Sequence, residues 1–120
     1  MVSTQIAPIL GQLQLLRTAL TLLASSSEEQ LDHLAALGIP DAVDELALEF
    51  DDAAPLVPQL VAAKAITTEA EHAIHLLDQR LTSMSGREHS QLWTRSALKT
   101  APQWTEIRAL ARSALDLLAA

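Results

Sequence analysis

The chain of 120 residues contains no cysteine. Disulfides, zinc sites built on thiolates and thiol nucleophiles are therefore excluded together. The absence of cysteine suits a reducing compartment, and we expect a cytoplasmic protein. The N-terminus also lacks the basic start and compact apolar segment of a signal peptide. Because polar residues interrupt the uncharged stretch 1–16, we expect no membrane-spanning segment.

Glycine and aromatic residues are almost as scarce, with three of each. Loops that cradle phosphates need clustered glycines, whereas Gly11, Gly38 and Gly86 lie far apart. Nucleotide-binding folds of the Rossmann and P-loop kinds are therefore excluded. Nucleic-acid binding is not expected either, because the chain has only eight Lys and Arg residues. Trp93 and Trp104 lie near several basic residues, but we interpret both rings as anchors of a helical core.

The apolar residues that are present favour helices. Leucine and alanine supply 23 and 21 residues, while valine and isoleucine together supply ten. Leucine and alanine are strong helix formers, whereas strands favour β-branched and aromatic residues. The length suits one domain over residues 1–120. We therefore predict an all-α fold, a compact single-domain bundle of five to seven helices around an apolar N-terminal helix.

That N-terminal helix is predicted over residues 2–23, with Pro8 near its first turn. Seven apolar residues at alternating spacings of four and three share one stripe: Val2, Ile6, Ile9, Leu13, Leu16, Leu20 and Leu23. Leu15 and Leu22 form a second stripe, and Arg17 is the only charged residue before Glu28. A helix that is apolar on two sides is usually enclosed, so we place it at the bundle centre or in a dimer seam.

Capping patterns predict where the next helices begin and end. Ser27, followed by Gln30, fits the start of a second helix, and Gly38 fits its left-handed end. Asp41 is predicted to cap a third helix that runs to about Ala54.

Further helices are predicted in the second half of the chain. One should begin at Thr67 or Thr68 and stop at Gly86, and another should span residues 88–99. Thr100, with Gln103 three residues later, is predicted to cap the last helix.

Acidic residues dominate the first part of the chain, and the net charge is −7. Four of them share the polar face of the predicted third helix: Asp41, Glu45, Glu49 and Asp52. This face is either a solvated surface or, with the apolar Leu48 at its centre, a docking surface for a basic partner. Glu45, Leu48, Glu49 and Asp52 are therefore the candidate partner-binding residues. Leu48 could equally pack inside the chain.

The histidines offer the remaining candidate chemistry. His72 and His75 are three residues apart on one predicted helix, so their rings could share a metal ion. Both lie roughly 150° from the apolar face at about 100° per residue, however, and no third ligand is evident. Asp32 cannot readily orient His33, because adjacent helical residues point apart. We expect solvated surfaces at these positions, no catalytic residue, no metal and no cofactor.

These observations favour a non-catalytic protein-interaction or self-association module. The partner is expected to be a protein or a second copy, with a homodimer formed through the seam of the N-terminal helix if that seam is exposed. An alternative is an immunity-like or antitoxin-like acidic inhibitor of a basic partner. A metal-binding helical enzyme that uses the His72 and His75 side ranks last.

Overall fold

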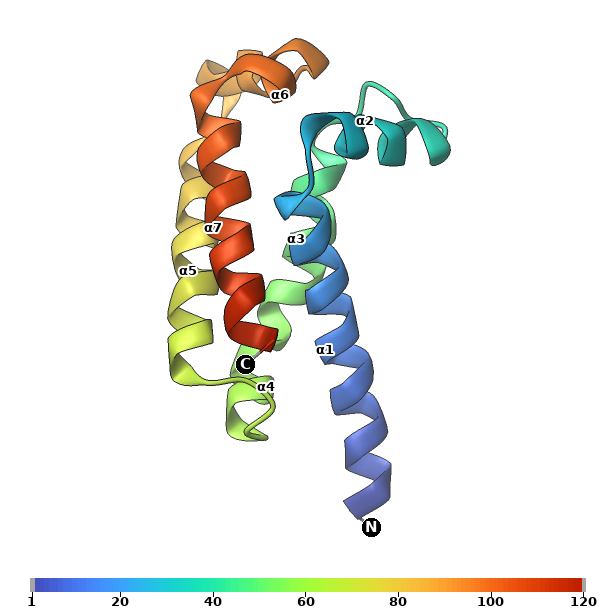
Figure 1. Ribbon diagram of the computed structural model, residues 1–120, viewed down its shortest axis with the longest axis vertical. Coiled ribbons are helices and arrows are strands. Elements are labelled where there is room, and N and C mark those ends of the chain that lie inside the picture. Colours follow the sequence, from blue (N-terminus) through green and yellow to red (C-terminus); the bar gives the residue numbers. More distant parts are fainter. Residues whose placement is uncertain (1, 120) are drawn as a thin grey trace.

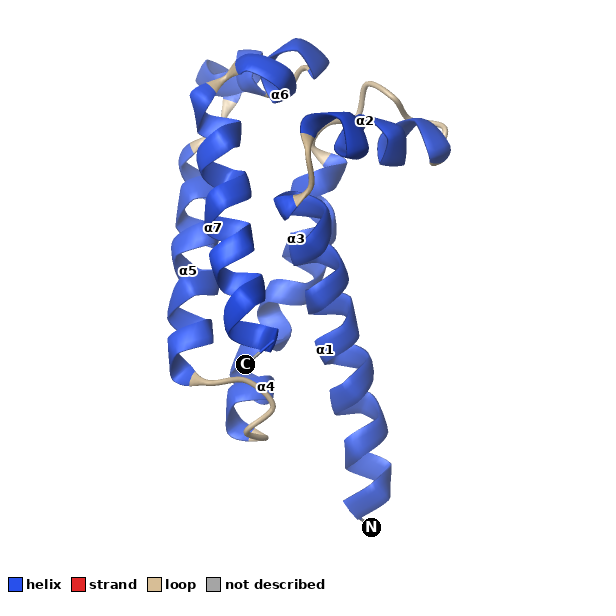
Figure 2. Ribbon diagram, in the orientation of Figure 1, coloured by secondary structure: helices blue, strands red, loops and turns tan. Residues whose placement is uncertain are grey.

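The computed structural model describes the backbone of residues 2–119 and the side chains of residues 8–118. This part of the chain contains helices and no strand, which confirms the predicted all-α fold (Figure 2). The elements in order are α1 (Val2–Ala24), α2 (Ser27–Ala36), α3 (Glu45–Ala53), the 3-10 turn η1 (Ala54–Leu56), α4 (Val57–Ala62), α5 (Thr68–Ser83), the 3-10 segment η2 (Arg87–Leu92), α6 (Arg95–Thr100) and α7 (Pro102–Ala119).

Four helices form the body of the bundle. α7 packs against α1 on one side and α5 on the other, and α3 packs against α1 (Figure 1). α2 and α6 cross one end of this body, and α4 lies towards the other end (Figure 1). The N-terminal and C-terminal helices are thus direct neighbours.

The core is built from the apolar faces that the helical periodicity predicts. Leu16, Leu20, Phe50 and Ile107 are fully buried where α1, α3 and α7 meet. Burying one such side chain stabilises a fold by about 1.5–3 kcal/mol. Trp104 is also fully buried, and its indole N–H donates to the carbonyl of Leu92 at 2.7 Å.

The second tryptophan packs edge-on against the first. The ring centroids of Trp93 and Trp104 are 5.3 Å apart, with an interplanar angle of 86°. The Trp93 indole N–H donates to the carbonyl of Met84 at 2.8 Å. The two indole rings therefore hold η2 and α6 against α5 and α7, and both contribute to the core.

The start of α2 differs from the prediction by one residue. Ser26 is the capping residue: its hydroxyl accepts from the Glu29 N–H at 3.1 Å, and Glu29 accepts from the Ser26 N–H at 3.2 Å. The predicted cap, Ser27 with Gln30, is wrong, because any of three consecutive serines can cap and the position of Glu29 selects Ser26. Gly38 does end α2 as predicted, with φ of 78°.

Asp41 does not cap α3, which begins four residues later, at Glu45. The Asp41 carboxylate instead forms an ion pair with Arg95, with Oδ1 and Nε 2.9 Å apart, so it links the loop after α2 to α6. The chain between Ile39 and Glu45 forms turns that a capping rule does not describe.

The predicted start of α5 at Thr67 or Thr68 is confirmed, because the Thr67 hydroxyl accepts from the Ala70 N–H at 3.1 Å and caps the helix. The predicted helix over residues 88–99 is instead two pieces, η2 and α6, because Thr94 caps a separate helix. Thr100 does not cap the last helix: its hydroxyl donates to the Ser96 carbonyl at 2.9 Å. α7 begins at Pro102, a residue well suited to a first helical position because it has no N–H to satisfy.

α1 extends past the rest of the bundle at its N-terminal end (Figure 1). The radius of gyration is 14.9 Å, against about 13.6 Å for a compact chain of this length. Pro8 lies inside α1, beyond its first turn, so the predicted position of Pro8 near the first turn is wrong. The side chains of Val2 and Ile6 lie outside the described residues.

Within one copy of the chain, α1 is enclosed on one side only. Its first stripe is used in the core, since Leu16, Leu20 and Leu23 are fully buried. On the second stripe, Leu22 is half-buried but Leu15 is 61% exposed. α7 and α3 cover the side of the first stripe, and no described segment covers Leu15.

One buried polar network links the last turn of α1 to α2, α6 and α7. Gln30 is fully buried, and its amide N–H groups donate to the carbonyls of Leu22 and Leu23 at 3.1 Å. Both carbonyls belong to the last turn of α1, where the regular helical donors run out. The Leu22 carbonyl also accepts from the Ser25 N–H at 3.1 Å. Nε and Nη2 of Arg108 donate to the Gln30 amide oxygen at 3.2 and 3.1 Å, and Nη2 also donates to the Leu98 carbonyl. Burial lowers the pKa of the Arg108 guanidinium.

We predict that Gln30→Leu destabilises the fold by about 1–3 kcal/mol, because it leaves the Leu23 carbonyl and part of the Arg108 guanidinium without partners. Urea denaturation followed by circular dichroism measures this loss. Gln79→Leu, at an exposed position of α5, is the matched control and should change the stability by less than about 0.5 kcal/mol. Equal effects of the two substitutions would show that the network contributes nothing.

Candidate functional site

The predicted partner-binding residues lie on one side of α3, but they differ in exposure. Leu48 is 47% exposed, so it does not belong to the core. Asp52 is exposed and Glu45 is half-buried. An apolar side chain therefore stands in solvent among carboxylates.

Glu49, the fourth candidate, already has a partner within the chain. Its Oε2 atom lies 2.9 Å from Nε2 of His33, and the pair joins α3 to α2. We predicted His33 to be a surface residue, and it is in fact only partly exposed. Sequence spacing gave no signal for this pair, because sixteen residues separate its members.

A groove runs along α1 beside this pair. Two adjoining hollows of about 420 and 330 Å³ share Gln14, Thr18 and Glu49 in their walls. Small and polar side chains of α1 line most of its length: Gly11, Gln14, Thr18, Ala19, Thr21 and Ser25. Leu15, Arg17 and Leu22 also line it, and His33 of α2 with Asp52 and Ala53 of α3 completes the wall. At about 100° per residue, this face of α1 lies opposite the buried stripe.

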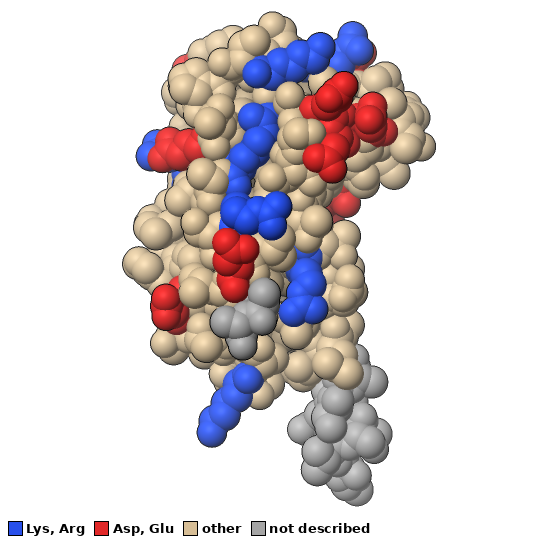
Figure 3. Space-filling model, in the orientation of Figure 1, with Lys and Arg blue, Asp and Glu red and all other residues tan. Residues whose placement is uncertain are grey.

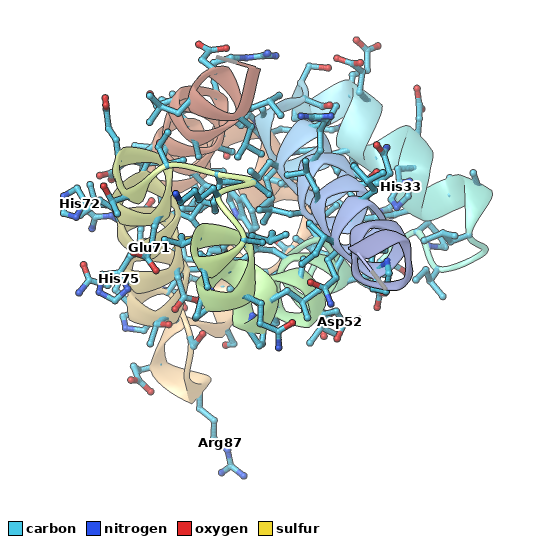
Figure 4. All side chains as sticks on the ribbon, turned by 90° about the horizontal axis from the view of Figure 1, so that it is seen from below. His33, Asp52, Glu71, His72, His75 and Arg87 are labelled. Carbon is cyan, nitrogen blue, oxygen red and sulfur yellow. The ribbon has the colours of Figure 1, made fainter. Side chains whose placement is uncertain are left out.

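His72 and His75 point away from α5 into solvent, on the side of the molecule opposite His33 (Figure 4). Within residues 8–118, no three His, Asp or Glu side chains gather closely enough to hold a metal ion. His75 lines a small hollow of about 180 Å³ together with Glu71 and Asp78.

Near this hollow, Asp51 of α3 lies in an unfavourable environment for a charge. Partial burial raises the pKa of the Asp51 carboxyl, and the negative charges of Asp78 and then Asp52 raise this pKa further. Asp78 belongs to α5, so the fold brings together acids from two helices that sequence analysis treated separately.

A cleft of about 540 Å³ lies between α2 and α6. Arg95 and Lys99 of α6 line one wall and Asp32 of α2 lines the other. Basic side chains also form a band on the face shown in Figure 3, with an acidic cluster beside the upper end of that band. Opposite charges therefore face each other in this cleft, which gives it little net attraction for an ion of either sign.

Comparisons with protein-family models, with curated proteins and with solved structures found no match. Among the described residues, no helix has both the length and the apolar character needed to cross a membrane. The candidate site consists of the exposed face of α1, the groove beside it and the acidic side of α3.

We predict that Asp51→Asn raises the melting temperature at neutral pH. An acid whose pKa is raised by folding contributes stability below its unfolded pKa, about 3.9, and loses this contribution as pH rises through the folded pKa. The neutral amide avoids that loss, so the gain should be present at pH 7 and vanish near pH 3. Thermal unfolding at both pH values measures it. The gain should also shrink in an Asp78→Asn background, and an equal gain at both pH values would contradict the electrostatic cause.

Proposed function

We propose that this protein is a non-catalytic self-association module whose α1 helix pairs with α1 of a second copy. The observation that carries the proposal is the exposure of Leu15, at 61%, on a face of α1 that α3 borders at one edge but does not cover. Leu10 of the same helix, about 140° around its axis from Leu15, is 59% exposed. An exposed apolar side chain beside a groove is a candidate contact of an interaction surface.

The physical state of the projecting part of α1 supports the same proposal. An isolated helix of about a dozen residues is marginal in water, because tertiary packing supplies most helical stability. Pro8 weakens this part further, since an interior proline removes one backbone hydrogen bond. A partner helix would supply the missing packing.

The neutrality of this segment favours a second copy as the partner. Residues 1–16 carry no charged side chain, so two molecules with net charge −7 can meet here without direct repulsion. A strongly charged partner would gain no complementary charge from this segment.

We predict that Leu15→Glu weakens self-association by about a hundredfold or more, because two leucines leave a symmetric interface at about 1.5 kcal/mol each or more. Sedimentation equilibrium over a range of concentrations measures the dissociation constant. Leu76→Glu is the matched control, because Leu76 is 42% exposed on α5. A wild-type chain that stays monomeric at millimolar concentration would refute the proposal.

A second function is supported by the exposure of Leu48 among acidic residues: docking of a basic partner on the outer side of α3. An apolar contact at the centre of a charged rim would supply affinity, and the carboxylates would speed association. Glu45 and Asp52 would act as the rim, because Glu49 already contacts His33. This second function corresponds to the alternative of an immunity-like or antitoxin-like acidic inhibitor of a basic partner.

We predict that Leu48→Glu changes folding stability by less than about 1 kcal/mol, because the side chain already contacts water. The same substitution should abolish binding of an amphipathic helical Lys/Leu peptide, measured by fluorescence anisotropy in low salt. Leu76→Glu again serves as the control and should bind as wild type does. If both variants bind equally well, the peptide senses only net charge and the docking surface does not exist.

A further inference from the structure

We propose that the two α1 helices pair antiparallel, with residues 2–14 of each copy lying in the α1–α3 groove of the other. This inference rests on the proposed self-association and specifies its geometry. The projecting part of α1 in each copy then contacts the groove of the other copy. The two identical contacts are related by a two-fold axis near Gln14. Such an interface uses the same surface twice, as closed dimers do.

The lengths of the two parts agree. At about 1.5 Å per residue, residues 2–14 form a rod of about 20 Å. The groove residues of α1 run from Gly11 to Ser25, which spans about 21 Å on the same scale. An antiparallel partner centred near Gln14 therefore covers the groove along its whole length. In a parallel pair in register, residues 2–14 of the two copies would lie beside each other and not in the grooves.

In the register that places Gly11 opposite Thr18 of the partner, most groove positions of α1 oppose a position on the same helical face. Arg17 and Ala19, at the two edges of the groove, are the exceptions. Gln14 then lies opposite the partner's Leu15, and Pro8 lies opposite the partner's Thr21. No atom lies within 4 Å of the position that a Cβ on Gly11 would occupy, so the surface at Gly11 is open. A glycine at a helix crossing allows two backbones to approach closely, and Thr18 opposite is small enough to preserve that approach.

Charge also favours the antiparallel direction. α1 has no acidic residue in its first turn to offset the positive end of its helix dipole. In the antiparallel register this end reaches the partner's α1–α2 junction, where Glu28 and Glu29 occupy the first turn of α2. The docked segment adds no charge beside Glu49 and Asp52 on the groove wall. In a parallel pair, the two positive helix ends would instead lie side by side.

Disulfide mapping tests this register cleanly because the natural chain has no cysteine. Gln14→Cys should form a covalent dimer under mild oxidation, because its twin lies about one residue away along the axis. Thr18→Cys alone should not, because its twin lies about 10 Å away along the axis, beyond the limit of about 7 Å for the Cα atoms of a disulfide. A mixture of Gly11→Cys and Thr18→Cys chains should give the mixed covalent dimer.

The outcomes separate this inference from the proposed function. Self-linking of Thr18→Cys without the mixed product indicates a parallel pair, which overturns the inference and leaves self-association intact. A dimer by sedimentation that links at none of these positions places the interface elsewhere and also overturns it. A chain that is monomeric at all concentrations overturns both. Circular dichroism of each variant before oxidation verifies that the helices are retained.

Discussion

The packing of the buried stripe of α1 against α7 is the contact on which the bundle depends. It joins the first helix of the chain to the last, so the elements between them are held in a closed arrangement. Leu16 and Leu20 of α1 and Ile107 of α7 are fully buried in the core that this contact helps to close. The Gln30 and Arg108 network lies at one end of the contact and ties it to α2 and α6.

The same contact determines which face of α1 is available to a partner. Because the first apolar stripe is used inside the chain, the face that carries Leu15 and Gly11 points outward. That face continues from the groove beside α3 to the part of α1 beyond the bundle. The self-association that we propose would use this outward face, while the buried stripe serves folding.

The acidic side of α3 illustrates how tertiary contacts subdivide a charged surface. Glu49 is committed to His33 and lines the groove, while Leu48 remains in solvent. Partial burial and the negative charges of Asp78 and Asp52 raise the pKa of the Asp51 carboxyl. A strip that looks uniform in sequence therefore has separate structural and exposed parts.

The sequence by itself determined the fold class, the buried stripe of α1, the cap at Thr67 and the turn at Gly38, because these depend on helical periodicity and on local backbone chemistry. Only the tertiary structure decided the exposure of Leu15 and Leu48, the His33–Glu49 pair and the buried partners of Gln30. Each of these depends on which helices become neighbours. Periodicity identifies an apolar stripe but does not say whether a neighbouring helix covers it, and a hydrogen bond between residues 78 positions apart leaves no local pattern in the chain.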